Sequence, residues 1–254
     1  MKNAVLLTLP LLGAMAVLAL AQPTAVNPGG PAARVPVVVE LFTSEGCSSC
    51  PAADAALRQL ETAQSVPGVE VIALGEHVDY WNRLGWKDGF SSAAFTARQR
   101  QYASGFGSGA YTPQAVVNGR YEFVGSHAAE LAQTVAKAAT TPRATVTLTT
   151  AGNAARVQVA NVPAGTAAAE VLLVVTESGL ASQVGGGENS GRLLRHAPVV
   201  RQLISLGKMG PAGTFSGATE LKLNAGWKRP NLRAVALVQE TASHRIVGVA
   251  TAAL

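Results

Sequence analysis

The two cysteines of this 254-residue chain stand in one short motif, Cys47-Ser48-Ser49-Cys50. The motif follows an apolar, β-branched run at 37–43 and precedes a segment with helical spacing of apolar residues. Two thiols at this spacing can close into a small disulfide, and the free N–H groups of a helix N-terminus favour the thiolate. The sequence therefore predicts thiol redox chemistry, with Cys47 as the exposed nucleophile and Cys50 as the buried resolving thiol.

Two other interpretations of the cysteine pair stay open. A disulfide that closes so short a loop adds little stability, but it could be an inert clip in a non-catalytic interaction module. The thiols could instead bind a metal such as copper, or sense redox state, together with His77. The sequence contains no second C-x-x-C motif that would complete a tetrahedral site.

Strands and helices alternate around the motif. A strand, a helix and a second strand in sequence predict a right-handed βαβ unit with parallel strands. An Asn118-Gly119 pair between two apolar runs predicts a hairpin with a type I′ turn. The expected elements are strands at 36–43 and 69–74, helices at 51–64 and 91–102, hairpin strands at 115–117 and 120–124, and a helix at 126–140.

The composition changes near residue 142. Beyond it, short β-branched or alternating segments are separated by Gly, Pro, Asn and Ala, which is typical of an antiparallel sandwich. The expected strands are 145–149, 156–159, 170–176, 215–223, 233–239 and 246–250.

The chain resembles a family of secreted bacterial proteins catalogued as a domain of unknown function (family 1223), in four strings. They are VELFTSEGCSSCPAAD at 39–54, HVDYW at 77–81, LGW at 84–86 and YTPQ at 111–114. The motif and Thr112-Pro113 also resemble the thioredoxin-like superfamily, in which a cis-proline loop packs against the C-x-x-C. The resemblance implies an α/β thioredoxin-like domain at 35–141, with a mixed sheet flanked by helices, and an all-β, sandwich-like domain at 142–254.

The same resemblance assigns roles to three further residues. A cis Pro113 would hold the backbone of Thr112 against the cysteines, where an extended substrate could pair with it. Glu40 lies near the position at which thioredoxins carry a buried acid that accepts a proton during exchange. An ordinary trans proline and an exposed edge carboxylate are the alternatives at Pro113 and Glu40.

Two candidates for contacting substrate, His77 and Trp81, follow the second expected strand. His77 could tune the cysteine thiolate or shuttle a proton, and Trp81 could line a groove, because ligands gather at the carboxyl ends of parallel strands. A structural histidine is the alternative for His77.

The glycine-rich segment 185–191 matches neither common phosphate-loop pattern. It begins a polar string that also resembles the family and that we expect to dock against the redox domain or to shape its cleft, with a solvated surface segment as the alternative. This string consists of Glu188, Asn189, Arg192, His196 and Arg201.

The N-terminus and the composition bear on location and partners. Residues 1–21 are typical of a cleaved export signal, with Lys2, an apolar stretch and Ala19-Leu20-Ala21, and 22–34 are typical of a flexible lead-in. We therefore expect a periplasmic or secreted protein without stable membrane insertion. The formal net charge of +5 is spread along the chain, so no nucleic-acid partner is expected. The expected partners are protein thiols, protein disulfides or a small thiol, and no cofactor is expected.

Overall fold

The segment before residue 142 begins with the expected βαβ unit. The computed structural model describes Met1 and residues 34–254, so the predicted export signal and nearly all of the lead-in lie outside the described residues. Parallel strands β1 (Val35–Thr43) and β2 (Val69–His77) are joined by α1 (Cys50–Ala63). The register pairs Thr43 with His77, so the C-terminal end of each strand lies beside the other.

Two more helices and a hairpin follow in the predicted order. They are α2 (Ala93–Phe106), β3 (Gln114–Val117), β4 (Tyr121–Val124) and α3 (Ala128–Ala138). Asn118 and Gly119 both have positive φ, at 47° and 62°, as the predicted type I′ turn requires. Apolar side chains of α1 and α3 pack on one face of the sheet, and those of α2 pack on the other face.

The predicted fold class is wrong, because one large sheet runs through both halves of the chain. Eight strands, in the order β13-β12-β7-β10-β2-β1-β3-β4, form a mixed sheet, and the protein is mostly β with three short helices in the described residues. The added strands are β7 (Ala169–Glu177), β10 (Val199–Lys208), β12 (Leu232–Glu240) and β13 (Ile246–Ala253).

The predicted and observed fold classes differ because of strand β10, which the sequence did not predict. It pairs antiparallel with β7 and meets β2 in parallel at Val199 and Gly75. The strands after residue 142 therefore extend the sheet of the first half instead of forming a separate all-β layer. The domain division at residue 142 stays a prediction.

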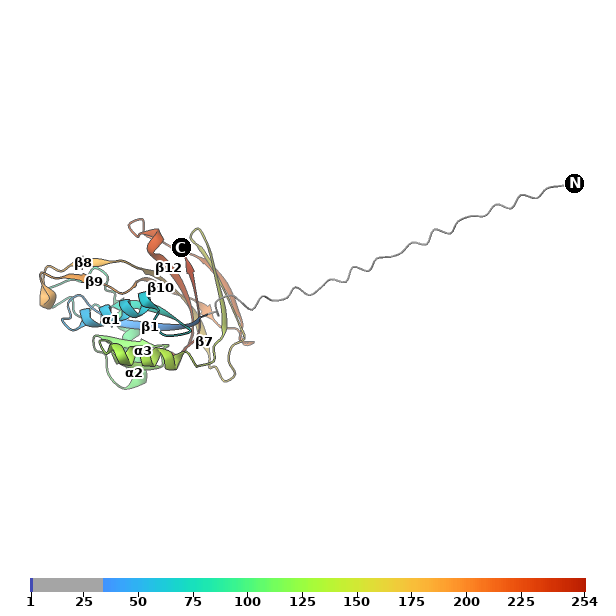
Figure 1. Cartoon of the computed structure of the whole chain (residues 1–254), viewed down its shortest axis with the longest axis horizontal. Helices are drawn as coiled ribbons and strands as arrows, with labels where there is room; N and C mark the ends of the chain where they lie inside the picture. Colours follow the sequence, from blue (N-terminus) through green and yellow to red (C-terminus); the bar gives the residue numbers. More distant parts are fainter. Residues whose placement is uncertain (2–33) are drawn as a thin grey trace. The chain divides into compact units, whose positions relative to one another are not determined.

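Two small sheets complete the described fold. In the first, β5 (Thr145–Ala151), β6 (Ala154–Ala160) and β11 (Phe215–Glu220) bury an apolar face against β7 and β12. The second pairs β8 (Ala181–Gln183) with β9 (Leu193–Arg195). Arg58 of α1 donates to the carbonyl of Arg195 at 2.7 Å, which places the β8–β9 hairpin beside α1 (Figure 1). Short 3₁₀ turns η1 (Gly187–Asn189) and η2 (Arg229–Asn231) lie in the loops.

Alternation along β1 decides which side chains meet α1. Val37, Val39 and Leu41 belong to the core under α1 and α3, so Val38 and Glu40 point to the other face, toward α2. Both faces are buried, as is usual for strands with helices on both sides. Among the described residues, no helix is long and apolar enough to span a membrane.

Candidate active site

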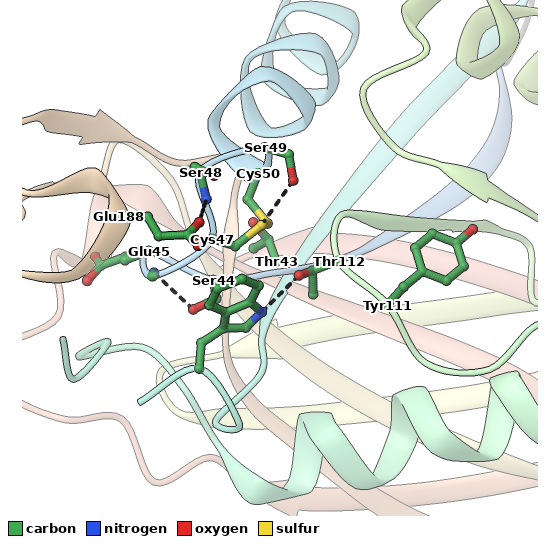
Figure 2. Close-up of a disulfide and its surroundings, with 12 residues drawn as sticks. Thr43, Ser44, Glu45, Cys47, Ser48, Ser49, Cys50, Tyr111, Thr112 and Glu188 are labelled. Carbon is green, nitrogen blue, oxygen red and sulfur yellow. Dashed lines mark hydrogen bonds between the residues drawn. A yellow bond between two sulfur atoms is a disulfide. The ribbon is translucent and has the colours of Figure 1, made fainter. Parts of the chain in front are cut away.

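Cys47 and Cys50 form a disulfide at the N-terminus of α1, with their Cα atoms 5.4 Å apart (Figure 2). Only the two serines between them are exposed. The relative exposure of Cys47 is 0% and that of Cys50 is 1%. The prediction that Cys47 is an exposed nucleophile is therefore wrong for the oxidised protein, because other segments cover it.

The start of α1 still provides an environment that can stabilise a thiolate. The helix begins at Cys50, and its N-cap residue, Ser49, makes no side-chain capping bond. The Ser49 hydroxyl instead lies 3.4 Å from Sγ of Cys47. The free N–H groups of the first helical turn and this hydroxyl would favour negative charge on sulfur.

The loop that contains η1 holds the motif from the other half of the chain. The fully buried Asn189 donates from Nδ2 to the carbonyl oxygens of Glu45 and Cys47, both at 2.9 Å. The exposed Glu188 accepts from the backbone N–H of Ser48 at 2.9 Å (Figure 2). The Ser48 side chain, and after it this backbone bond, lower the pKa of the Glu188 carboxyl. Glu188 and Asn189 of the polar string thus dock against the motif, whereas Arg201 pairs with Glu177 of β7.

The glycines of this loop allow it to pack tightly on Trp86. A Cβ at Gly186 would lie 2.4 Å from the carbonyl oxygen of Gly85, and one at Gly185 would lie 3.1 Å from the Trp86 ring. The Trp86 indole N–H donates to Glu45 Oε2 at 2.7 Å. The glycine run is thus explained by close packing, in agreement with its failure to match phosphate-loop patterns.

Trp81 connects the motif with the Thr112-Pro113 loop. A Cβ at Gly46 would lie 3.2 Å from Cβ of Trp81, and the Trp81 indole donates to the Thr112 hydroxyl at 2.9 Å. The Thr112–Pro113 peptide bond is cis, as predicted. Figure 2 includes Thr112 among the residues that surround the disulfide. The structure therefore brings Cys47, Cys50, Trp81 and Thr112-Pro113 together.

Glu40 lies on the opposite face of the sheet from α1 and does not join this group. Its carboxylate accepts from Arg98 at 2.6 Å and from the Tyr102 hydroxyl at 2.5 Å, all three side chains being buried. Arg98 also donates to Gln239, which comes from β12. Glu40 thus helps to fix α2 on the sheet, and its position gives no support to the predicted proton acceptor.

His77 is buried and hydrogen-bonded, which agrees with the structural alternative. Its Nδ1 donates to Asp88 Oδ2 at 2.7 Å, and the same oxygen accepts from the backbone N–H of Glu45 at 2.9 Å. Burial lowers the pKa of His77, but the Asp88 carboxylate outweighs burial, so the net pKa is raised. Burial raises the pKa of Asp88, and His77 reverses this to a net decrease.

Three buried polar residues beside the motif had no predicted role. Asp54, four residues after Cys50 on α1, accepts from the Thr43 hydroxyl at 2.7 Å and from the backbone N–H of Ala197 at 3.2 Å. Its spacing from Cys50 was a usable signal, because positions i and i+4 share one helix face. Glu45 lay within the family strings, whereas no local pattern marked Asp88.

Comparison with known proteins identifies the family. Residues 38–239 match the model of a family described as a protein of unknown function, DUF1223. The chain belongs to the DUF1223 family. This confirms the family resemblance, while the thioredoxin-like superfamily receives no support from the comparisons.

Solved structures agree with this membership. The chain is similar to an Agrobacterium tumefaciens protein solved by X-ray crystallography as a structural genomics target. The two are 29% identical with a TM-score of 0.67, over 85% of this chain and 92% of the other. A domain of the outer membrane lipoprotein Omp28 from Porphyromonas gingivalis is 11% identical, over 44% and 88% of the two chains, with a TM-score of 0.29. The search of curated proteins found no match.

In this DUF1223 protein the site can perform one chemistry directly. A disulfide can be attacked by a thiolate, and two sulfurs on one helix terminus can accept or give two electrons together. The predicted copper alternative needs two thiolates, whereas here the sulfurs are bonded to each other.

Proposed function

We propose that the protein is a thiol–disulfide oxidoreductase that exchanges electrons through Cys47 and Cys50. The observation that supports this most is the Cys47–Cys50 disulfide at the N-terminus of α1, with Trp81 and Thr112 beside it. No other cysteine is present in the sequence, so this pair is the whole thiol chemistry of the chain.

The exchange would proceed in two steps that transfer two electrons. A thiolate of the partner attacks Sγ of Cys47, forms a mixed disulfide and releases the Cys50 sulfur as a thiolate, which takes up a proton. A second partner thiolate then attacks the partner's own sulfur in the mixed disulfide. This step releases Cys47 as a thiolate, so the partner leaves as a disulfide and the protein as a dithiol. The reverse sequence oxidises a partner dithiol.

Access to Cys47 would require movement of the loop that contains η1. Because Asn189 and Glu188 hold the backbone of Cys47 and Ser48, a macromolecular partner must displace or reshape these contacts before a thiolate can approach. Trp81 and Thr112 would then contact the partner's chain, and Pro113 would position Thr112. The partners would be protein thiols or disulfides, or a small thiol.

The proposed setting is outside the cytoplasm. Residues 1–21 have the composition of an export signal, and a protein that exchanges disulfides in the periplasm or after secretion would use no cofactor.

Single-cysteine variants test the proposed function. Cys50→Ser leaves Cys47 as a lone thiol, and we expect the folded protein to form a mixed disulfide with oxidised glutathione, seen as one added glutathione in the intact mass. Cys47→Ser is the matched control and should react more slowly, because Cys50 lies within the helix. If neither folded variant reacts while both react in denaturant, the oxidoreductase proposal fails.

A second candidate is a non-catalytic module closed by an inert disulfide. The burial of both sulfurs favours it, because an inert clip needs no access. The same experiment separates the two candidates, since an inert clip predicts no reaction in either folded variant.

A further inference from the structure

Three side chains from distant segments meet beneath the cysteine motif. Asp54 comes from α1, His77 from the end of β2, and His196 from the connection between β9 and β10. Each offers a ligand atom, and these atoms all lie within 4.8 Å of one another. All three residues are buried, with 4%, 1% and 4% of their surface exposed. The fold has therefore gathered two imidazoles and a carboxylate in one enclosed place.

One imidazole in this cluster carries a buried nitrogen without a hydrogen-bond partner in the described part of the chain. The Nδ1 atom of His77 bonds to Asp88, which leaves Nε2 free, whereas Nε2 of His196 lies 3.3 Å from Oε1 of Glu45. Buried polar atoms are nearly always partnered, and each exception needs an explanation. The unpartnered nitrogen of His77, with the His196 ring 5.0 Å from the His77 ring, points to a ligand at this place.

Glu45 contacts the cluster through His196. Its buried Oε1 atom lies 3.3 Å from Nε2 of His196, and its Oε2 atom accepts from the Trp86 indole. Glu45 is not among the groups whose ligand atoms lie within 4.8 Å of one another, so it neighbours the site without being one of its ligands. A carboxylate beside a metal-bound histidine is a common supporting contact.

The negative charge of the carboxylates in and beside the cluster also favours binding of a cation. Among the described residues, the buried carboxylates of Glu45, Asp54 and Asp88 form no ion pair with lysine or arginine. In this part of the chain the ion-pair contacts of Asp88 and Glu45 are with histidines only, at 2.7 Å from His77 and 3.3 Å from His196, and Asp54 has no ion-pair partner. Buried negative charge is costly unless it is paired. A divalent cation held by neutral imidazoles would balance two of these charges, and the His77–Asp88 bond would then be the carboxylate–histidine contact that usually supports a metal-bound histidine.

We propose that Asp54, His77 and His196 bind one divalent first-row metal ion of the zinc type. The donor set of nitrogen and oxygen suits such an ion, and three protein ligands leave a fourth coordination position open. The ion joins α1, β2 and the β9–β10 connection, and its ligand on α1, Asp54, lies four residues after Cys50. The site uses no sulfur, so it is separate from the predicted alternative with Cys47, Cys50 and His77 and does not depend on the redox proposal.

Zinc binding by the untagged full chain tests the site. The protein is kept oxidised, stripped with a chelator and titrated with Zn²⁺ alone. We expect one ion per chain and a raised melting temperature. X-ray absorption of this wild-type complex should show nitrogen and oxygen ligands, with imidazole scattering and no sulfur. Failure to bind a stoichiometric ion, or a sulfur ligand, overturns the proposal.

Matched variants locate the ion. His196→Gln and Asp54→Asn should each weaken zinc binding by more than tenfold. Asp88→Asn should weaken it by about 10- to 100-fold, because a supporting partner is lost. The exposed His127→Gln is the control and should bind as the wild type does. The double variant Cys47→Ser with Cys50→Ser should keep its zinc. Unchanged affinity in His196→Gln, or loss of zinc in the cysteine double variant, overturns the assignment.

Discussion

Asn189 donates a 2.9 Å hydrogen bond to the carbonyl oxygen of Cys47, which lies 142 residues earlier in the chain. Its other bond from the same nitrogen goes to Glu45, and its Oδ1 accepts from Arg192 at 2.5 Å. One buried amide thus fixes the backbone of the cysteine motif from the second half of the chain. Thiol–disulfide exchange at Cys47 would therefore require this contact to be displaced or reshaped.

The substitution Asn189→Ala should loosen the motif. Two buried carbonyl groups would lose their donor, so we expect the free energy of unfolding to fall by about 2–4 kcal/mol. The folded protein should also lose its disulfide to dithiothreitol several-fold faster, as measured by alkylation and intact mass. The exposed Gln133→Ala is the control, with neither effect expected. An unchanged reduction rate would show that Asn189 does not control access.

Gly186→Ala should displace the covering loop by steric conflict. The new methyl group would lie 2.4 Å from the carbonyl oxygen of Gly85, and we expect a loss of about 1–3 kcal/mol in the free energy of unfolding. Gly105→Ala is the matched control, because nothing lies within 4 Å of its added methyl group, and it should stabilise α2 by roughly 0.5–1 kcal/mol. Urea unfolding measures both. Equal effects of the two substitutions would contradict the packing of the loop on Trp86.

Arg98→Met should destabilise the protein, because it removes the positive partner of the buried Glu40 and Glu76 carboxyls on the α2 face of the sheet. The buried Glu40 carboxyl would lose its guanidinium partner, so we expect the free energy of unfolding to fall by about 3–5 kcal/mol. The exposed Arg100→Met, in the same helix, should change it by less than about 0.5 kcal/mol. Adding Glu40→Gln to Arg98→Met should recover part of the loss in a double-mutant cycle. Additive effects would show that the two side chains do not interact.

Glu76 makes stability depend on pH. Burial and then the Glu40 carboxylate raise the pKa of Glu76 well above 4.5, against the opposing effect of Arg98. The folded state therefore binds this proton more tightly than the unfolded state does. Its contribution to stability is full below about pH 4.5 and is lost as pH rises through the folded pKa. Glu76→Gln should flatten this decline in urea titrations at a series of pH values, whereas the exposed Glu130→Gln should not. Parallel curves for wild type and Glu76→Gln would contradict the assignment.

The sequence predicted the first seven elements well because their signals are local. The parallel pair follows from β-branched runs on either side of a helical pattern, and the Asn118-Gly119 turn follows from the φ values that those residues tolerate. Strand β10 was missed for a physical reason. Its pairing with β7 shifts register between Val200 and Gln202 and again between Ser205 and Gly207, so its apolar residues do not alternate.

The candidate site was predictable only where its residues lie close in sequence. The cysteine pair and the cis Thr112–Pro113 bond came from motifs, whereas the Asn189 contact joins segments that no local pattern connects. The position of Glu40 could not be read from alternation, because both faces of β1 are buried and both carry apolar residues. The cluster of Asp54, His77 and His196 depends on three segments meeting, which only the complete sheet determines.

The reduction potential of the Cys47–Cys50 pair tests the central claim most directly. The full oxidised chain is equilibrated in glutathione or dithiothreitol buffers of defined potential, and the fraction of alkylated Cys47 and Cys50 is read by intact mass. The account predicts a reversible two-electron transition between about −120 and −270 mV, the range of thiol–disulfide oxidoreductases. A pair that stays oxidised below about −300 mV, as structural disulfides do, would contradict it.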